Sequence, residues 1–469
     1  MFSAFSVSSA RKRGYTRLAA ATLSSGLVAA GLLATAGVAA ADGTPQSEGG
    51  ATATLDGLKT YGMAVVHDRG TDAQVPAGLF EMSVDDGGTL QTYCIDIGNP
   101  AQGDARYHET PWSGTSLSGN KNAGRVRWIL QNSYPQVNNL AALAAAADDK
   151  GLTEQDAAAG TQVAIWRYSD GADVDAVDPR AEKLADYLVK HARNLPEPAG
   201  SLTLEPPAVS GHPGKRLGPV TVHTNADSVT VTPPADAATT GVKIVGEDGK
   251  EVTSATDGSR IYFEVPKTMQ DGAAELTVQA SATVPVGRAF ASESRSQTQI
   301  LAGSSESTVS ATATANWAET GAIPALSAEE NCANGGLDIT VANAGDAAYT
   351  FAVMGTDHTI AARKSQTVTI PLQEDQAYDF AIGGRGGYKK WFRGVLDCKT
   401  ESSTGGLATQ TVGEPSPVTA GGTAAENTNL AETGTSNATP IIAGTAIALV
   451  VIGGAVLVLV RRKKSPTRE

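Results

Sequence analysis

The sequence predicts a multidomain protein in which an α+β domain at residues 56–198 precedes two all-β, immunoglobulin-like sandwiches, a flexible linker and a C-terminal transmembrane helix. Three observations support this prediction. The chain has 469 residues, which is more than one hydrophobic core usually holds. Helical periodicity is largely confined to the first of these regions. An apolar run without a charge stands near the C-terminus.

The composition excludes several classes of function. The formal net charge is −13, and basic residues concentrated at both ends leave the central part more acidic still. A surface of that charge repels phosphate backbones, so we expect no nucleic-acid partner. Three cysteines, together with six histidines that show no ligand spacing, predict neither a metal site nor a cofactor.

Residues 1–41 have the features of a secretory signal peptide. A basic stretch at residues 11–17 precedes an apolar run that extends to residue 41. The small residues Ala39 and Ala41 frame a cleavage site before Asp42. A first membrane helix is the alternative, because the run is longer than an average signal-peptide core. A linker rich in Gly, Ser, Thr and Ala follows at residues 42–55.

Residues 56–198 combine strand-like and helix-like patterns, which predicts an α+β domain. Short segments with β-branched or aromatic residues predict strands at residues 59–67 and 88–97. Apolar periodicity predicts four helices, at residues 123–132, 139–147, 154–168 and 179–195. Thr153 and Asp156 form a weak capping box for the third helix, and Asp178 with Pro179 begins the fourth.

Residues 199–317 and 318–400 are predicted to form the two sandwiches. Alternating apolar and polar residues between Gly, Asp and Pro turns predict strands in both regions. In the first region these strands are at residues 228–232, 260–265 and 274–283. In the second they are at residues 337–341, 349–354 and 367–370.

Cys332 and Cys398 bracket the second sandwich, each beside a predicted terminal strand. An exported chain meets an oxidising exterior, where cysteines pair, so we expect a disulfide between them. A closed loop of this length contributes roughly 4 kcal/mol in the chain-entropy model. Two unpaired thiols are the alternative.

The C-terminal region combines three features in order. Residues 401–429 are rich in Ser, Thr, Gly, Pro and Ala, which predicts a flexible linker. Residues 440–460 carry no charge and are long enough for a membrane helix. A basic cytoplasmic tail follows at residues 461–469. Shortly before the helix stands the pentapeptide Leu430, Ala431, Glu432, Thr433 and Gly434.

This arrangement resembles the LPxTG-type sorting signal of Gram-positive surface proteins, in its LAxTG variant. The resemblance implies that a sortase cuts between Thr433 and Gly434 and joins Thr433 to peptidoglycan. The mature protein would then be secreted and covalently anchored to the cell wall, after a transient membrane-anchored precursor.

Cys94 is left without a cysteine partner, and three interpretations compete. It is a buried structural thiol, as lone cysteines commonly are. It is the nucleophile of a secreted Cys/His hydrolase, for which His67, His108 and His191 are the histidines of the same domain. Or its sulfur is bonded covalently to a group other than cysteine.

The segment Thr161-Gln162-Val163-Ala164 matches the TQxA signature of the thioester domains of Gram-positive surface adhesins, and Tyr93-Cys94-Ile95-Asp96 resembles that family's cysteine segment. The resemblance covers about residues 56–198. It implies a thioester between Cys94 Sγ and Gln162 Cδ, and hence a surface adhesin that binds amine-bearing targets covalently. The glutamine acyl group is consumed in that reaction, so we expect no turnover, no catalytic residue and no enzyme.

Proximity explains how two unreactive groups could combine, because holding them in contact lowers the activation free energy by up to roughly 7–11 kcal/mol. On the helix at residues 154–168, Ala158, Ala159, Ile165 and Trp166 share the face of Gln162. We expect Tyr93, Ala158, Ile165 and Trp166 to surround the bond, with small alanines allowing close approach and Trp166 excluding water. A non-covalent surface binding protein with an inert Cys94 remains the main alternative. The target nucleophile and any Lys–Asn isopeptide bonds in the sandwiches stay open.

Overall fold

The computed structural model describes residues 49–68 and 71–399. The predicted signal peptide, the linker at residues 401–429, the sorting motif at residues 430–434, the apolar run at residues 440–460 and the basic tail lie outside these residues. Within the two described ranges, no helix is long and apolar enough to cross a membrane.

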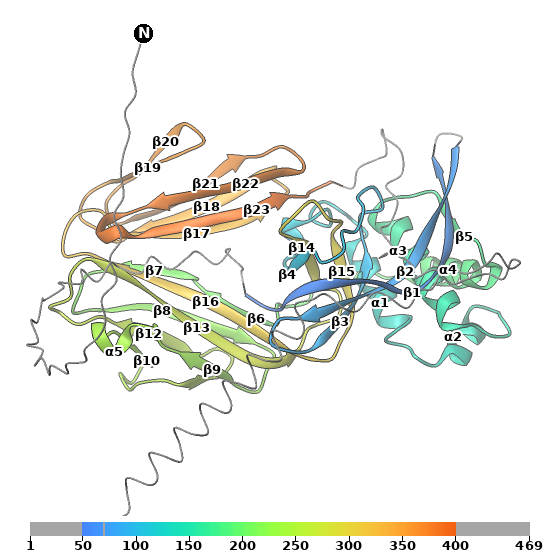
Figure 1. Cartoon of the computed structure of the whole chain (residues 1–469), viewed down its shortest axis with the longest axis horizontal. Helices are drawn as coiled ribbons and strands as arrows, with labels where there is room; N and C mark the ends of the chain where they lie inside the picture. Colours follow the sequence, from blue (N-terminus) through green and yellow to red (C-terminus); the bar gives the residue numbers. More distant parts are fainter. Residues whose placement is uncertain (1–48, 69–70, 400–469) are drawn as a thin grey trace, which may run out of the picture. The chain divides into compact units, whose positions relative to one another are not determined.

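A seven-stranded sheet forms the base of the N-terminal domain (Figure 1). Its strand order is β2-β3-β15-β14-β4-β1-β5. β1 and β2 form a long antiparallel hairpin whose register runs from Ala53 opposite Val84 to Asp68 opposite Thr71. The strand bounds are β1 (Thr52–Asp68), β2 (Thr71–Val84), β3 (Thr89–Cys94), β4 (Arg106–Thr110), β5 (Val174–Ala176), β14 (Ala289–Ser292) and β15 (Gln299–Ser304).

Helix α3 is the central helix of this domain and packs against β1, β2 and β3. It begins with the predicted capping box, in which Thr153 and Asp156 exchange side-chain and backbone hydrogen bonds. A Cβ on its Gly160 would collide with the carbonyl of Ala181, so this glycine allows α4 to approach closely. The helices are η1 (Trp112–Gly114), α1 (Ala123–Asn132), α2 (Leu140–Ala146), α3 (Glu154–Ser169) and α4 (Pro179–His191). The four predicted α-helices are confirmed.

The middle region consists of a four-stranded sheet, β10-β12-β8-β6, and a five-stranded sheet, β11-β9-β13-β16-β7. Buried side chains from both sheets, among them Val220, Phe263 and Val278, belong to one core that continues into the N-terminal domain. The elements are β6 (Leu202–Glu205), β7 (Ala208–Gly211), β8 (Arg216–Thr224), β9 (Val229–Thr232), α5 (Ala237–Thr240), β10 (Lys243–Val245), β11 (Ser254–Ala255), β12 (Arg260–Glu264), β13 (Gly272–Thr283) and β16 (Glu306–Trp317).

The structure differs from the predicted division at residues 198 and 199. β14 and β15 fall within residues 199–317, yet they pair with β4 and β3 of the N-terminal sheet, with Phe290 opposite Glu109 and Gln299 opposite Cys94. Figure 1 shows these two yellow strands among the blue strands of that sheet. The chain therefore returns from the middle sheets to add β14 and β15 to the N-terminal sheet, and then re-enters the five-stranded middle sheet with β16. An alternating pattern predicts a strand but not which sheet it joins, because pairing depends on tertiary contacts.

The third region is all β, as predicted, and has its own hydrophobic core. Its sheets are β17-β18-β21 and the hairpins β19-β20 and β22-β23. Cys332 and Cys398 form the predicted disulfide, with Cα atoms 5.1 Å apart. The elements are β17 (Pro324–Asn331), β18 (Gly336–Asn343), β19 (Tyr349–Val353), β20 (Thr356–Ile360), β21 (Lys364–Pro371), β22 (Gln376–Gly383), η2 (Arg385–Gly387) and β23 (Lys389–Leu396).

Candidate functional site

The structure brings Cys94 and Gln162 together. Cys94 is the last residue of β3, and Gln162 lies in the middle of α3, which crosses it. The Cys94 backbone N–H donates to Gln162 Oε1 at 3.0 Å, and Gln162 Nε2 donates to the Cys94 carbonyl at 2.8 Å. Both residues have a relative exposure of 0%. The Gln162 carboxamide is therefore fixed at two points beside the cysteine and shielded from water.

The sulfur of Cys94 is held by the chain that follows it. Sγ donates to the Asp96 carbonyl and accepts from the Asp96 backbone N–H, each at 3.2 Å. Between them, Ile95 donates its N–H to the Thr298 carbonyl at 3.1 Å, just before β15. The turn that carries the sulfur is thus anchored to Thr298, the residue that precedes β15.

The residues predicted to surround the site are all buried, namely Tyr93, Ala158, Ile165 and Trp166. Tyr93 donates its hydroxyl to the Tyr134 carbonyl at 2.9 Å. The indole N–H of Trp166 has no hydrogen-bonded oxygen or nitrogen partner in the described part of the chain. Small residues do allow close approach between helix and sheet, since a Cβ on Gly62 of β1 would lie 3.0 Å from Ala159 Cβ. These contacts leave the side chains of Cys94 and Gln162 little freedom to move apart.

The surroundings of Cys94 raise the pKa of its thiol well above the ordinary value. Burial is the largest cause, followed by the negative charge of Asp170 and by that of Asp96 when Asp96 is ionised. The backbone at Asp96 and the side chain of Trp166 act in the opposite direction. The thiol is therefore protonated at neutral pH, and a thiolate that forms here is a poor leaving group.

The arrangement can support acyl chemistry at the Gln162 carbonyl. The Cys94 N–H points at Oε1, the atom on which negative charge develops when a nucleophile adds to the carbonyl carbon. A fixed backbone donor aimed at that atom stabilises the addition intermediate, as an oxyanion hole does. The Cys94 carbonyl holds the amide nitrogen, the group that departs when sulfur replaces it.

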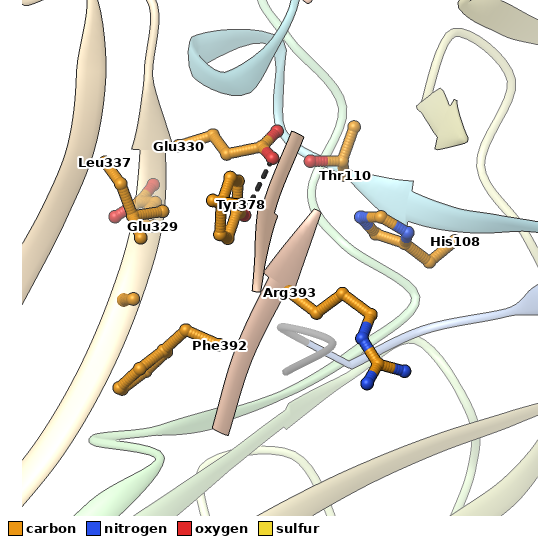
Figure 2. A pocket seen from close by; sticks show the side chains of 9 residues that line it. His108, Thr110, Glu329, Glu330, Leu337, Tyr378, Phe392 and Arg393 are labelled. Carbon is orange, nitrogen blue, oxygen red and sulfur yellow. Dashed lines mark hydrogen bonds between the residues drawn. The ribbon is translucent and has the colours of Figure 1, made fainter. Parts of the chain in front are cut away.

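The three histidines considered for a Cys/His hydrolase have other surroundings. His67 contacts Asp72 at 2.8 Å and Asp175 at 3.3 Å. His191 Nδ1 lies 2.7 Å from the Tyr187 carbonyl. Figure 2 shows His108 lining a small cavity opposite Glu330, Tyr378 and Arg393 of the third region. Among the described residues, no hydrogen bond joins a histidine to the Cys94 sulfur, so the geometry does not support the hydrolase interpretation.

Several residues of the site were not predicted. Asp96 and Asp170 are close neighbours of Cys94 and Gln162 in sequence, and their burial could not be read from spacing. Thr298 and Asp397 come from distant parts of the chain and meet through a hydrogen bond of 2.7 Å. Thr298 lies in a polar stretch at residues 296–299, and the pattern of that stretch does not indicate that Thr298 contacts the site.

Metal-binding groups can be sought only among the described residues, and the sorting motif does not lie among them. In residues 49–68 and 71–399, no group of three or more His, Cys, Asp or Glu side chains is arranged to hold a metal ion. Leu430, Ala431, Glu432, Thr433 and Gly434 lie outside the residues that the structure describes.

Comparison with known proteins identifies two segments. Residues 91–194 match the family model of the thioester domain, and residues 324–395 match that of the C-terminal domain of bacterial phospholipase C. No curated protein matches the sequence.

Solved structures that are similar to this chain include two proteins with TIE in their names. The Bacillus anthracis TIE protein has 15% identity and a TM-score of 0.26, over 75% of this chain and 81% of its own. The thioester domain of the Enterococcus faecium TIE86 protein has 16% identity and a TM-score of 0.28, over 60% of this chain and 99% of its own. Cys94 and Gln162 both lie within the segment that matches the thioester domain family.

Proposed function

We propose that this protein is a surface adhesin that attaches covalently to amine-bearing targets through a thioester between Cys94 Sγ and Gln162 Cδ. The observation that carries the proposal is the pair of hydrogen bonds by which the Cys94 backbone fixes the Gln162 carboxamide. The family match of residues 91–194 supports the same chemistry.

The thioester forms when the Cys94 sulfur replaces the amide nitrogen on the Gln162 carbonyl carbon. The Cys94 sulfur adds to Gln162 Cδ, the C–N bond breaks, and the thiol proton leaves with the amide nitrogen as ammonia. A thiol and a carboxamide do not react at an appreciable rate in free solution, so holding them in contact must lower the activation free energy. Their burial at 0% exposure keeps water from the product.

The product stores an activated acyl group. An unprotonated amine, such as a lysine side chain of the target, adds to the Gln162 carbonyl and displaces Cys94 as a free thiol. The raised pKa of the Cys94 thiol makes sulfur a poor leaving group, so the stored bond reacts slowly with weak nucleophiles. Each molecule reacts once, because its glutamine acyl group ends in the new amide. The protein is therefore a reactive adhesive and not an enzyme.

Display at the cell surface completes the proposal. The signal peptide at residues 1–41 exports the chain, and a sortase joins Thr433 to peptidoglycan. The middle and third regions then act as spacers that hold the N-terminal domain away from the wall. The target supplies the amine, and the target is identified by the surface to which the protein becomes crosslinked.

Intact mass of the purified protein tests the thioester. We expect a mass lower by one ammonia than that of the chain with its disulfide, and a gain of one methylamine after treatment with that amine. Cys94→Ala and Gln162→Ala should abolish both effects. Gln155→Ala is the matched control, since Gln155 is an exposed glutamine of the same helix.

The opposite result has a clear meaning. A wild-type protein at full mass, with Cys94 alkylated freely after unfolding, would overturn the thioester and favour the non-covalent surface binding protein.

A further inference from the structure

Buried carboxyl groups lie beside the proposed thioester, and one of them belongs to the third region. Asp96 follows Cys94 by two residues and has no exposed surface. Asp170 is the C-cap residue of α3, and its carboxylate accepts the Ile97 backbone N–H at 2.8 Å. Asp397 comes directly after β23, next to the disulfide-bonded Cys398. Carboxyl groups buried together this close to a reacting sulfur affect its chemistry through their charge.

Thr298 connects the third region to the cysteine turn. Its carbonyl accepts the Ile95 backbone N–H at 3.1 Å. Its hydroxyl donates to Asp397 Oδ2 at 2.7 Å. Two further bonds fix the third region here, from the Cys332 N–H to the Ser113 carbonyl at 3.0 Å and from Arg295 Nε to the Asp375 carbonyl at 3.1 Å. Asp397 is thus held in place by contacts from both sides.

Two carboxyl oxygens of this group have no hydrogen-bond partner within the described ranges, Asp96 Oδ1 and Asp397 Oδ1. The other oxygen of Asp96 accepts from Asn99 Nδ2. Burial raises the pKa of Asp96, and the charge of Asp397 raises it further, followed by that of Asp170. Burial also raises the pKa of Asp397, against the hydrogen bond from Thr298. The remaining titratable groups that face the pair are Cys94, Tyr107, Glu330, Glu374 and Asp375.

Above neutral pH this pair carries one negative charge before it carries two, because each carboxylate opposes ionisation of the other. The charge resides on Asp397, since Asp96 is completely buried whereas Asp397 is only partly so and accepts the Thr298 hydroxyl. Asp96 keeps its proton. Within this pair, the carboxyl group next to the sulfur is therefore neutral, and the charge lies on the carboxyl group of the third region.

Neutrality at Asp96 matters when the sulfur leaves. The amine forms a C–N bond to Gln162 Cδ, the C–S bond breaks, and the sulfur takes the proton that the amine nitrogen releases. Negative charge develops on sulfur in this step, and an ionised Asp96 would oppose it. We propose, on the basis of the proposed thioester function, that Asp397 of the third region is a positioning residue that acts through Asp96. It keeps the negative charge of this pair away from the departing sulfur.

The test is the alkaline pH dependence of the reaction with hydroxylamine, a weakly basic amine that is unprotonated from neutral pH upward. The rate constant of the intact wild-type protein is divided by that of the Asp397→Asn protein at each pH. In the variant, Asp96 ionises at a lower pH than in the wild type, because the charge of Asp397 no longer opposes its ionisation. We expect a ratio near one at neutral pH that rises to roughly tenfold at alkaline pH, the effect of one unit charge several ångströms away in a protein interior.

A second variant and a control sharpen the result. Thr298→Val removes the hydroxyl that stabilises the charge on Asp397, so the ratio should rise in the same direction but less. Asp357→Asn, an exposed aspartate of β20 in the same region, should give a ratio of one at every pH. The ammonia loss is measured for each protein first, so that the rates report the reaction of the thioester with hydroxylamine and not the formation of the thioester.

The outcomes separate the two proposals. Ratios of one at all pH values for Asp397→Asn and Thr298→Val, with the thioester present, would overturn this inference and leave the proposed function standing. Loss of the thioester in both variants would also overturn it, because Asp397 would then serve folding or bond formation. A wild-type protein at full mass would overturn the thioester itself.

Discussion

Gln162 spans the backbone of Cys94, accepting its N–H at 3.0 Å and donating to its carbonyl at 2.8 Å. This two-point contact requires an oxygen and an NH2 group on one planar side chain, which glutamine provides and glutamate does not. The contact therefore depends on the geometry of this residue, apart from the reactivity proposed for it.

Replacing Gln162 by glutamate should abolish the thioester while preserving side-chain size. The carboxylate has no amide nitrogen to leave as ammonia, and one of its oxygens would face the Cys94 carbonyl without a proton between them. We expect the full calculated mass and a lower melting temperature, by the equivalent of about 1–3 kcal/mol for a buried unsatisfied group. Gln155→Glu, on the exposed side of α3, should keep both the ammonia loss and the melting temperature.

Much of the N-terminal domain could be predicted from sequence because its signals are local. Cys94 and Gln162 each stand in a short recognisable segment, and the α3 capping box is fixed by the spacing of Thr153 and Asp156. Local signals determine where a helix begins and which of its residues share a face.

The remainder of the site depends on long-range pairing. Gln299 lies opposite Cys94 only because β15 pairs with β3 after the chain has passed through strands β6 to β13 of the middle sheets. Asp397 reaches the cysteine turn only through Thr298. No periodicity or spacing encodes such meetings, since the same alternating strand could pair in either sheet.

Glu109 and Arg288 form a buried ion pair that should contribute strongly to stability. Arg288 Nε lies 2.9 Å from Glu109 Oε1, with side-chain exposures of 7% and 1%. The same carboxylate accepts from the Ser201 backbone N–H and hydroxyl and from the Ala51 N–H. Arg288→Met leaves this charge without its partner, so we expect a loss of about 3–5 kcal/mol in the free energy of unfolding by urea.

Arg260→Met is the control for that experiment. Arg260 contacts Glu247 at 2.8 Å, but both side chains are about half exposed. Exposed pairs of this kind contribute about 0–1 kcal/mol. Equal losses in the two variants would contradict the importance assigned to the buried pair.

Glu330 predicts a pH dependence of stability. Burial raises the pKa of Glu330 from 4.5 to about 7, with the Asp397 charge adding to the rise and the Tyr378 hydrogen bond opposing it. Between these two values the folded protein binds a proton that the unfolded chain has released, so stability falls as pH rises from 4.5 to 7. In Glu330→Gln this part of the fall should disappear.

Urea unfolding at several pH values across that window measures the effect. The difference in stability between variant and wild type should grow with pH and become constant above pH 7. Glu264→Gln, an exposed glutamate of β12, should follow the wild-type curve. A difference between Glu330→Gln and wild type that stays constant throughout would show that Glu330 does not titrate as assigned.

Counting free thiols in the unfolded protein distinguishes the states of the three cysteines. Cys332 and Cys398 are joined, so neither reacts with an alkylating agent before reduction. If Cys94 is held in the thioester, freshly unfolded wild-type protein shows no thiol, and protein treated first with methylamine shows one. A Gln162→Ala protein should show one thiol with or without methylamine, because its Cys94 has no acyl partner. One thiol in untreated wild-type protein, with no loss of ammonia, would contradict the covalent interpretation of the contact between Cys94 and Gln162.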